Sequence, residues 1–124
     1  MDMTASPHTP QQCGRIGEVL SRIGDRWTLP VTVTLREGPV RFNQIRRTVP
    51  GISQQMLTRT LRALERDGMV IRTVHPTVPP QVDYALTALG RGLADEAIRL
   101  GSWVNGHLGE IEANRALFDA RAAG

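Results

Sequence analysis

The sequence predicts a mainly α-helical domain that carries one small antiparallel β-hairpin. Two observations lead to this prediction. A strongly amphipathic helix is expected over residues 53–67, directly after a tight Pro50-Gly51 turn that separates it from a shorter helix. Two strands are expected next, at 69–74 and 82–86, joined by a loop that contains three prolines. This order of elements is that of a winged helix-turn-helix, with residues 69–86 as the wing.

The helix over 53–67 has clear ends and two distinct faces. Ser53 is a typical N-cap residue, and Gly68 can adopt the left-handed conformation that ends helices. At about 100° per residue, one arc holds the polar residues Gln54, Gln55, Thr58, Arg59, Arg62, Glu65 and Arg66. The opposite arc holds Met56, Leu57, Leu61, Ala63 and Leu64. One face is therefore expected to pack on the domain, while the other is free to bind a ligand.

The charge of the chain is concentrated around this helix. Of a net +3 over 124 residues, the segment 36–72 has eight arginines and three acidic residues, or +5, so the remainder is −2. Between Arg41 and Arg62 there is no acidic residue at all. A polar helix face alone indicates only a solvated surface, but an acid-free run of arginines favours a polyanionic partner. The sequence therefore predicts binding to double-stranded DNA.

The predicted contacts follow from the chemistry of each side chain. The candidate DNA-binding residues are Arg41, Asn43, Ser53, Gln54, Gln55, Thr58, Arg59, Arg62, His75 and Thr77. We expect the helix over 53–67 to enter the major groove, where glutamine can pair with adenine and arginine with guanine. Its cap hydroxyl and first N–H groups suit a phosphate, as does Arg62. The residues at 41 and 43 are expected to hold the DNA backbone, and those at 75 and 77 to lie at the wing tip.

The remaining chain is predicted to form helices on either side of this unit. Residues 1–10 are expected to be a flexible arm, and residues 11–124 a single domain. Helices are predicted over about 11–23 and 88–120, with a break in the second near Gly101 and Gly106. The apolar stripe of the second helix is longer than so small a domain can cover, which favours a homodimer, although packing back on the same domain stays open. The candidate dimer interface is Ile16, Leu20, Leu100, Trp103 and Val104.

Residues 27–36 give two conflicting signals. The β-branched run and Pro30 favour a strand, whereas Trp27, Val31 and Leu35 have the spacing of a helix face. If the segment is helical, Pro30 is expected to remove a hydrogen bond and bend the first turns. After it, a short edge strand is expected at 40–42 and a helix at 43–48.

Other classes of function have little support in the sequence. The three histidines, at positions 8, 75 and 107, fall in different predicted elements, and neither a glycine-rich phosphate loop nor Cys/His metal-ligand spacing is present. We therefore predict no enzyme, no cofactor and no metal. No apolar run of membrane-spanning length occurs, so a cytoplasmic protein is expected. The competing hypothesis is a winged helix that binds proteins without recognising DNA sequence, and the acid-free arginine face argues against it.

Several stretches together resemble the HxlR family of bacterial winged helix-turn-helix regulators, which is related to the MarR type. They are Gly24-Asp25-Arg26-Trp27-Thr28, Arg41-Phe42-Asn43-Gln44-Ile45, Pro50-Gly51-Ile52-Ser53, Asp67-Gly68 and Tyr84-Ala85-Leu86-Thr87. The resemblance runs from Cys13 to about Trp103. It implies a homodimeric transcription regulator, more commonly a repressor, in which the segment 27–36 is helical. The chain departs from the family at Gln81, because no Arg or Lys remains between Thr73 and Gly90 to contact phosphate.

Cys13 is the only cysteine, so an internal disulfide is excluded. Some relatives in the HxlR family sense oxidants or electrophiles through a cysteine near the start of the first helix, which implies that Cys13 is a candidate redox sensor. Arg15 or the helix N-terminus would stabilise its thiolate. The alternative is a small apolar residue in the dimer interface. Whether the effector is an oxidant, a small molecule or neither stays open.

Overall fold

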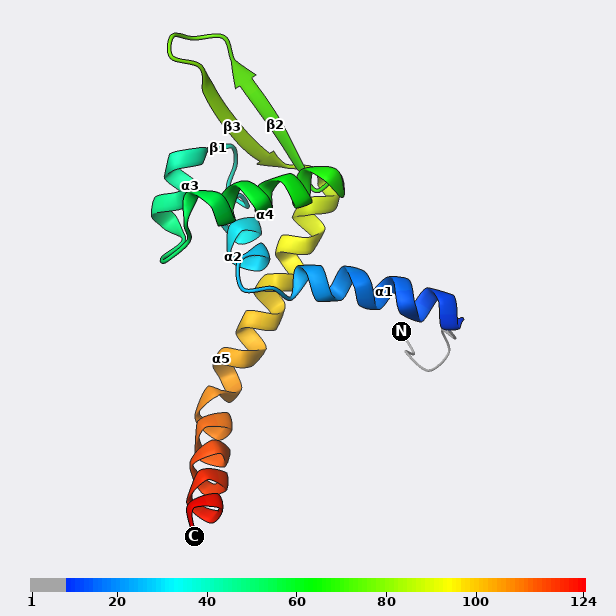
Figure 1. The fold of residues 1–124 in the computed structure, drawn as a ribbon, viewed down its shortest axis with the longest axis vertical. Helices are drawn as coiled ribbons and strands as arrows, with labels where there is room; N and C mark the ends of the chain where they lie inside the picture. The colour runs from blue at the N-terminus through cyan, green and yellow to red at the C-terminus, as the bar shows by residue number, and fades with distance from the viewer. Residues whose placement is uncertain (1–8) are drawn as a thin grey trace.

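The computed structural model describes residues 9–124, so most of the predicted N-terminal arm lies outside the described residues. Five helices and three strands follow one another along this part of the chain (Figure 1). They are α1 (Pro10–Ile23), α2 (Thr28–Thr34), β1 (Val40–Arg41), α3 (Phe42–Thr48), α4 (Gln54–Arg66), β2 (Val70–His75), β3 (Gln81–Leu86) and α5 (Ala88–Ala123). The mainly α-helical winged helix-turn-helix predicted from the sequence is confirmed.

The strands form one antiparallel sheet in the order β1-β3-β2. Strands β2 and β3 make the predicted hairpin, paired over six residues from Val70 opposite Leu86 to His75 opposite Gln81. The two residues of β1 add to the other edge of β3. The hairpin therefore rises from the body as a wing whose base is held on both sides of β3.

The helix-turn-helix is set by the local signals that the sequence contains. Gly51 lies in the turn between α3 and α4 with φ of +82°, a backbone conformation that favours glycine. The Ser53 hydroxyl accepts a hydrogen bond from the Met56 backbone N–H at 3.1 Å, which caps α4. At the other end Gly68 has φ of +76° and turns the chain into β2. The predicted start and end of this helix are confirmed to within a residue.

The core lies between α4, the sheet, α2 and the start of α5. It is built from the buried side chains of Val31, Leu35, Ile45, Val49, Ile52, Leu57, Leu61, Leu64, Val70, Tyr84, Leu86 and Ala94. The apolar arc of α4 supplies three of its most buried members, Leu57, Leu61 and Leu64. Since the apolar arc is anchored in the core, the polar arc of α4 must face solvent.

Residues 28–34 form helix α2, so the strand suggested by their β-branched side chains is wrong and the helix implied by the family resemblance is confirmed. Pro30 is the third residue of this helix, where backbone nitrogens have no partner within the helix. The expected loss of a hydrogen bond there is therefore wrong. Thr32 and Thr34 also donate hydroxyl hydrogen bonds to the carbonyl oxygens of Thr28 and Pro30, at 2.7 and 2.9 Å.

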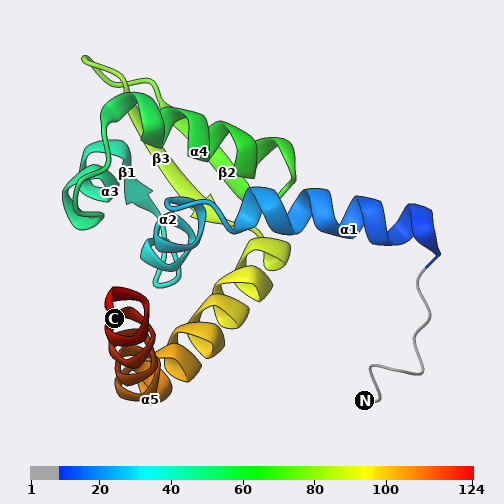
Figure 2. The same ribbon diagram turned by 60° about the horizontal axis from the view of Figure 1, so that its bottom comes forward.

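Helix α5 is continuous over 36 residues, so the predicted break near Gly101 and Gly106 is wrong. It bends in its orange part instead (Figures 1 and 2). Glycine in a helix costs about 1 kcal/mol relative to alanine, but it keeps its backbone N–H and so does not interrupt the hydrogen-bond ladder. Although α5 is long, no helix in residues 9–124 has a stretch apolar enough to cross a bilayer.

Helices α1 and α5 extend away from the body of the domain (Figures 1 and 2). No side chain of α1 is buried within the described chain, and in α5 the buried positions are confined to Gly90 and Ala94. Apolar side chains nevertheless line both helices, among them Ile16, Leu20 and Leu100. Two apolar surfaces are therefore left uncovered by the chain's own residues.

Candidate nucleic-acid interface

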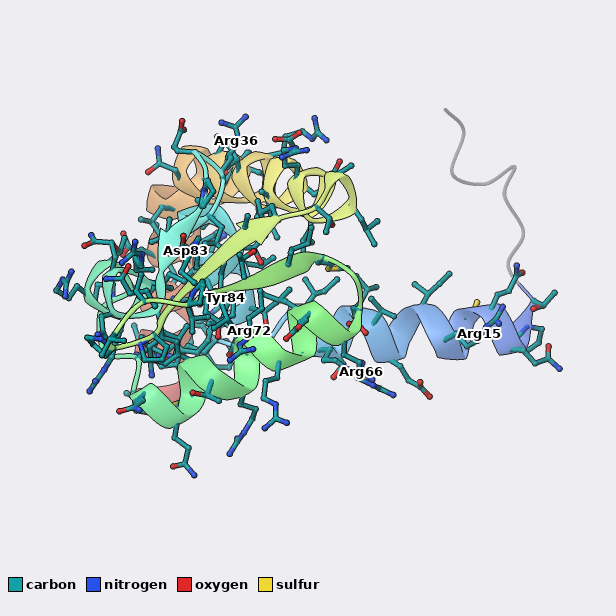
Figure 3. The ribbon with its side chains drawn as sticks, turned by 90° about the horizontal axis from the view of Figure 1, so that it is seen from above. Arg15, Arg36, Arg66, Arg72, Asp83 and Tyr84 are labelled. Atoms are coloured by element: carbon teal, nitrogen blue, oxygen red, sulfur yellow. The ribbon has the colours of Figure 1, made fainter. Side chains whose placement is uncertain are left out.

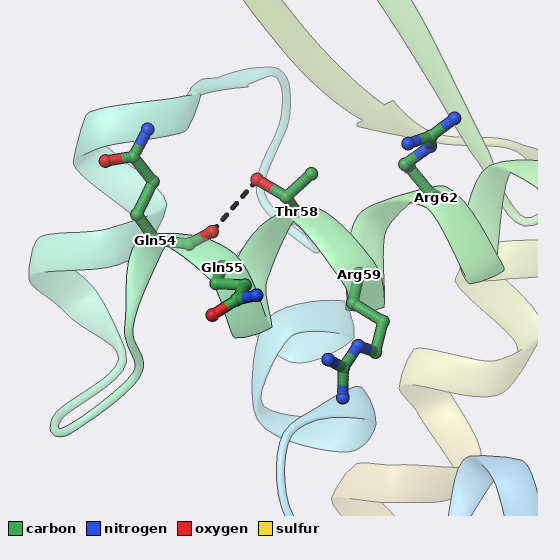
Figure 4. Close-up of a pocket in the computed structure, with 5 residues that line it drawn as sticks. All are labelled: Gln54, Gln55, Thr58, Arg59 and Arg62. Atoms are coloured by element: carbon green, nitrogen blue, oxygen red, sulfur yellow. Dashed lines mark hydrogen bonds between the residues drawn. The ribbon is translucent and has the colours of Figure 1, made fainter.

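The polar face of α4 forms a shallow, open groove of about 590 Å³ (Figure 4). It is lined by Gln54, Gln55, Thr58, Arg59 and Arg62. All five are exposed, and all five are among the residues predicted to contact DNA. One solvent-facing surface thus combines two amides, a hydroxyl and two guanidinium groups.

The two arginines of this face point in different directions (Figure 4). Arg59 extends toward the start of α2, where it lines a hollow together with Arg26 and Trp27. Arg62 extends toward the strands, where it lines a second hollow. The positive charge of α4 is therefore found on both sides of the helix. This arrangement suits contact with a DNA groove and with the phosphate backbone beside it.

Two hydroxyls on α4 are already engaged in hydrogen bonds. Thr58 Oγ1 donates to the Gln54 carbonyl oxygen at 2.9 Å (Figure 4). Ser53 Oγ accepts from the Met56 N–H, which leaves its own hydroxyl hydrogen to donate. Thr58 is consequently left to offer a methyl group and an acceptor to a base, and Ser53 a donor to a phosphate.

Arg41 and His75 meet at a shared carboxylate, that of Asp83 in the middle of β3. Arg41 Nε lies 2.6 Å from one oxygen of Asp83, and His75 Nε2 lies 2.7 Å from the other. The sequence predicted His75 at the wing tip, whereas the structure has it as the last residue of β2, just before the tip loop. The Asp83 carboxylate balances the charge of Arg41, so Arg41 is less available to DNA than predicted, while Asn43 stays exposed on α3.

The hydrogen bond to His75 holds the pKa of Asp83 below its usual value of 3.8; partial burial opposes this, and Arg41 reinforces it. A carboxyl whose pKa is lower in the folded protein contributes stability above its unfolded pKa and loses it as pH falls through the folded value. We therefore expect Asp83→Asn to reduce stability at neutral pH and to remove part of the loss seen below about pH 4. Urea unfolding of both proteins at several pH values measures this, and identical pH dependence would contradict it.

The tip of the wing carries little that binds phosphate. Thr77 is exposed, and its hydroxyl donates to the Pro79 carbonyl oxygen at 2.8 Å. No Arg or Lys lies between Thr73 and Gly90. The positive charge of the wing lies instead at its base, on Arg72 of β2 (Figure 3).

Arg72 and Asp83 are the two residues that sequence reasoning missed. A usable signal existed for Arg72, because it belongs to the +5 segment and has the two-residue spacing from Val70 and Val74 that puts all three on one face of a strand. Its position opposite Tyr84, which brings it to the α4 side of the sheet, depends on the hairpin register. Asp83 offered no comparable signal, since its partners come from two other strands.

The residues predicted for dimerisation and redox sensing are also exposed. Leu20, Leu100 and Trp103 have 60%, 54% and 56% of their surface open to solvent. Trp103 stacks on His107, with ring centroids 4.5 Å apart. Cys13 is a free, exposed thiol in the first turns of α1. Among residues 9–124, no cluster of three or more His, Cys, Asp and Glu side chains is placed to hold a metal ion.

Comparison with known proteins identifies the family. The model of the HxlR-like helix-turn-helix matches residues 22–112, most of the chain. The chain belongs to this family. A relative, YtfH of Escherichia coli K12, named as an uncharacterized HTH-type transcriptional regulator, is 42% identical over 106 residues, which are 86% of this chain and 82% of YtfH.

Solved structures agree with the HxlR assignment. The YtfH protein of Salmonella typhimurium superposes with a TM-score of 0.76 at 40% identity, over 82% of this chain and 90% of that one. The redox regulator HypR in its reduced form superposes with a TM-score of 0.73 at 37% identity, over 80% of this chain and 98% of that one. The chain is thus a transcriptional regulator with a helix-turn-helix DNA-binding fold, and HxlR proteins of this kind are not enzymes.

Proposed function

We propose that this HxlR protein is a homodimeric repressor that binds a palindromic operator, with α4 in the major groove and the β2–β3 wing beside it. The observation that carries the proposal is the exposed face of α4, which presents two glutamines and two arginines on a segment without acidic residues. The predicted contacts of Gln54, Gln55, Thr58 and Arg59 with base edges belong to this proposal, as do phosphate contacts of Ser53, Asn43 and Arg62. Repression is the role that the family resemblance implies, and binding to chromosomal DNA implies action in the cytoplasm.

The uncovered helices α1 and α5 support the homodimer. The chain exposes 9132 Å² of surface, whereas a compact monomer of 13.7 kDa exposes about 6,600 Å². This difference exceeds the roughly 800 Å² that each partner buries in a standard protein interface. A second copy that covers Ile16, Leu20, Leu100, Trp103 and Val104 would remove these apolar side chains from water. Two-fold symmetry would then present two copies of α4 to two half-sites of the operator. The half-sites would be separated by one helical turn of DNA, ~34–36 Å, or by a multiple of that distance.

Replacing Arg59 and Arg62 separately tests the assignment of the α4 face. We expect Arg59→Ala to cost about 1–3 kcal/mol of operator binding and to relax preference at one base pair, since a bidentate contact to a base is lost. We expect Arg62→Ala to weaken binding to all sequences alike and to reduce the salt slope by about one, because a phosphate contact is lost. Titration of operator and random duplexes at several salt concentrations separates the two effects. If both variants bind like the wild type, α4 is not the DNA-binding face.

We also propose that Cys13 responds to oxidants. The thiol is free and exposed near the N-terminal end of α1, and one structural relative is itself a redox regulator. Diamide is expected to abolish operator binding by the wild type and to leave Cys13→Ser unaffected. Binding assays before and after diamide, with reductant added back as a control, measure this. Equal loss of binding by both proteins, or by neither, would show that Cys13 is a packing residue.

A further inference from the structure

A small hollow opens between α4 and the wing, beside the groove already described. Its volume is about 390 Å³, and it is lined by Thr58, Arg62, Glu65, Arg72 and Tyr84. The first three belong to consecutive turns of α4, and the last two come from β2 and β3. The hollow is therefore formed only when the hairpin is packed against the helix.

The hairpin register brings Arg72 to this hollow. Arg72 is directly opposite Tyr84 across the β2–β3 ladder, so the two side chains share one face of the sheet. On that face Tyr84, Val70 and Leu86 are buried, whereas Arg72 is exposed at the edge of the core. Figure 3 shows Arg72 beside Tyr84, over α4, and Figure 4 shows Arg62 directed toward the strands. Two guanidinium groups from separate elements thus line one hollow.

Within residues 9–124, neither of these guanidinium groups forms an ion pair. Other arginines of the domain form ion pairs, as Arg22 does with Asp67, Arg36 with Asp95 and Arg41 with Asp83. Among residues 9–124, however, no carboxylate oxygen lies within 4.0 Å of a guanidinium nitrogen of Arg62 or Arg72. Glu65 also lines the hollow, so the formal charges of Arg62, Arg72 and Glu65 give the hollow a net charge of +1. The hollow therefore offers an anion two guanidinium groups without an ion-pair partner in the described chain, and the Tyr84 hydroxyl.

We propose that this hollow binds one phosphate of the DNA backbone, and that Arg72 is the phosphate contact of the wing. The inference rests on the proposed function, because α4 must lie in the major groove. A hollow between a helix in the major groove and a wing beside it faces the backbone strand that separates the two grooves. A guanidinium group donates two parallel hydrogen bonds to a phosphate, and the Tyr84 hydroxyl can donate another. No Arg or Lys is present at the wing tip, so Arg72 supplies the phosphate contact of the wing from within β2.

Glu65 sets the strength of this phosphate site. Its carboxylate repels a phosphate in the same hollow, so it reduces binding to every sequence equally. Glu65→Gln keeps the size and helix propensity of the side chain but removes the charge. It is therefore expected to strengthen binding to operator and random duplexes by the same factor.

The test compares Arg72→Gln with Arg36→Gln, which removes the same charge from the other side of the molecule (Figure 3). Arg72→Gln is expected to weaken binding about tenfold on operator and random duplexes alike and to lower the salt slope by about one. Arg36→Gln is expected to leave the slope unchanged. Operators in which one phosphate at a time is a neutral methylphosphonate then locate the site. One such phosphate per half-site should weaken the wild type and have no further effect on Arg72→Gln.

The outcomes separate this inference from the proposed function. Two results would contradict the phosphate site while leaving the proposed function intact, provided that the wild type recognises an operator. In the first, Arg72→Gln and Arg36→Gln bind DNA with the same affinity and salt slope. In the second, the loss of affinity caused by Arg72→Gln adds to the loss caused by a methylphosphonate at every position tested. If the wild type recognises no operator, the proposed function fails and the phosphate site fails with it. Circular dichroism and thermal unfolding of Arg72→Gln establish that a loss of binding is not a loss of folding.

Discussion

Gly90→Ala is expected to lower the free energy of unfolding by about 3 kcal/mol or more, because the added methyl group has no room. A Cβ atom at this position would overlap the Met69 carbonyl oxygen and lie 3.0 Å from Leu86 Cδ2. The Met69 carbonyl cannot move freely, because it accepts a hydrogen bond from the Thr87 N–H at 3.0 Å. Thr87 Oγ1 also donates to the Gly68 carbonyl oxygen at 2.6 Å. The overlap therefore falls on backbone that is held from two directions.

The matched control for this prediction is Gly92→Ala, in the same helix. A Cβ atom at Gly92 has no non-local heavy atom within 4 Å, so alanine is expected to stabilise the protein by about 0.5–1 kcal/mol through helix propensity. Urea unfolding of the two variants and the wild type measures both effects. Equal stability of Gly90→Ala and Gly92→Ala would mean that the start of α5 does not pack against the α4–β2 turn as described. This contact fixes the direction of α5 relative to the DNA-binding unit.

Leu20→Glu combined with Leu100→Glu is expected to separate the homodimer into monomers and to weaken operator binding at least about a hundredfold. Each change places a charge on an apolar surface that a second copy is proposed to cover. The fold of each monomer should be retained, because both leucines are more than half exposed and glutamate is as good a helix former as leucine. Binding weakens because two half-sites held by separate monomers lose the effective concentration that a dimer provides. Sedimentation and operator titration measure the two effects.

Ser102→Glu is the control for the dimer prediction. Ser102 lies on α5 about 200° around the helix from Leu100, so its side chain points away from the apolar stripe. The added charge is the same, and the protein is expected to remain dimeric with unchanged operator affinity. If Ser102→Glu and the double variant dissociate equally, charge alone opposes association. If both stay dimeric, α1 and α5 do not form the interface.

Helix α4 and its polar face were predictable because the signals are local. The spacing of Leu57, Leu61 and Leu64, the Ser53 cap and Gly68 all act within a few residues, and each is present in the structure. Helix α2 was harder, since strand propensity and helical spacing disagreed over the same residues. Burial of Val31 and Leu35 against the rest of the core outweighs the small preference of β-branched residues for strands. A tertiary effect of this kind is not visible in a propensity scale.

The parts of the site that sequence reasoning missed depend on contacts between distant elements. Asp83 is 42 positions from Arg41, yet the β1–β3 pairing makes them direct neighbours. Arg72 reaches the α4 side of the sheet only through the hairpin register. The sequence prediction of a break in α5 at Gly101 and Gly106 was wrong because a glycine keeps its backbone N–H, so the hydrogen-bond ladder continues through both positions. Sequence reasoning thus predicted helix α4 and its exposed polar face but not the contacts made by β2 and β3.

Selection of genomic fragments by the purified protein, followed by titration of the best fragment at two salt concentrations, tests the central proposal most directly. We expect enrichment of one or a few palindromic sites, each bound by two protomers, with affinity that falls steeply as salt rises. Such a result would establish a sequence-specific homodimeric regulator and identify its target genes. Uniform recovery of all fragments, or recovery of none, would contradict the proposal and show that the arginines of α4 provide only nonspecific attraction or contact a protein.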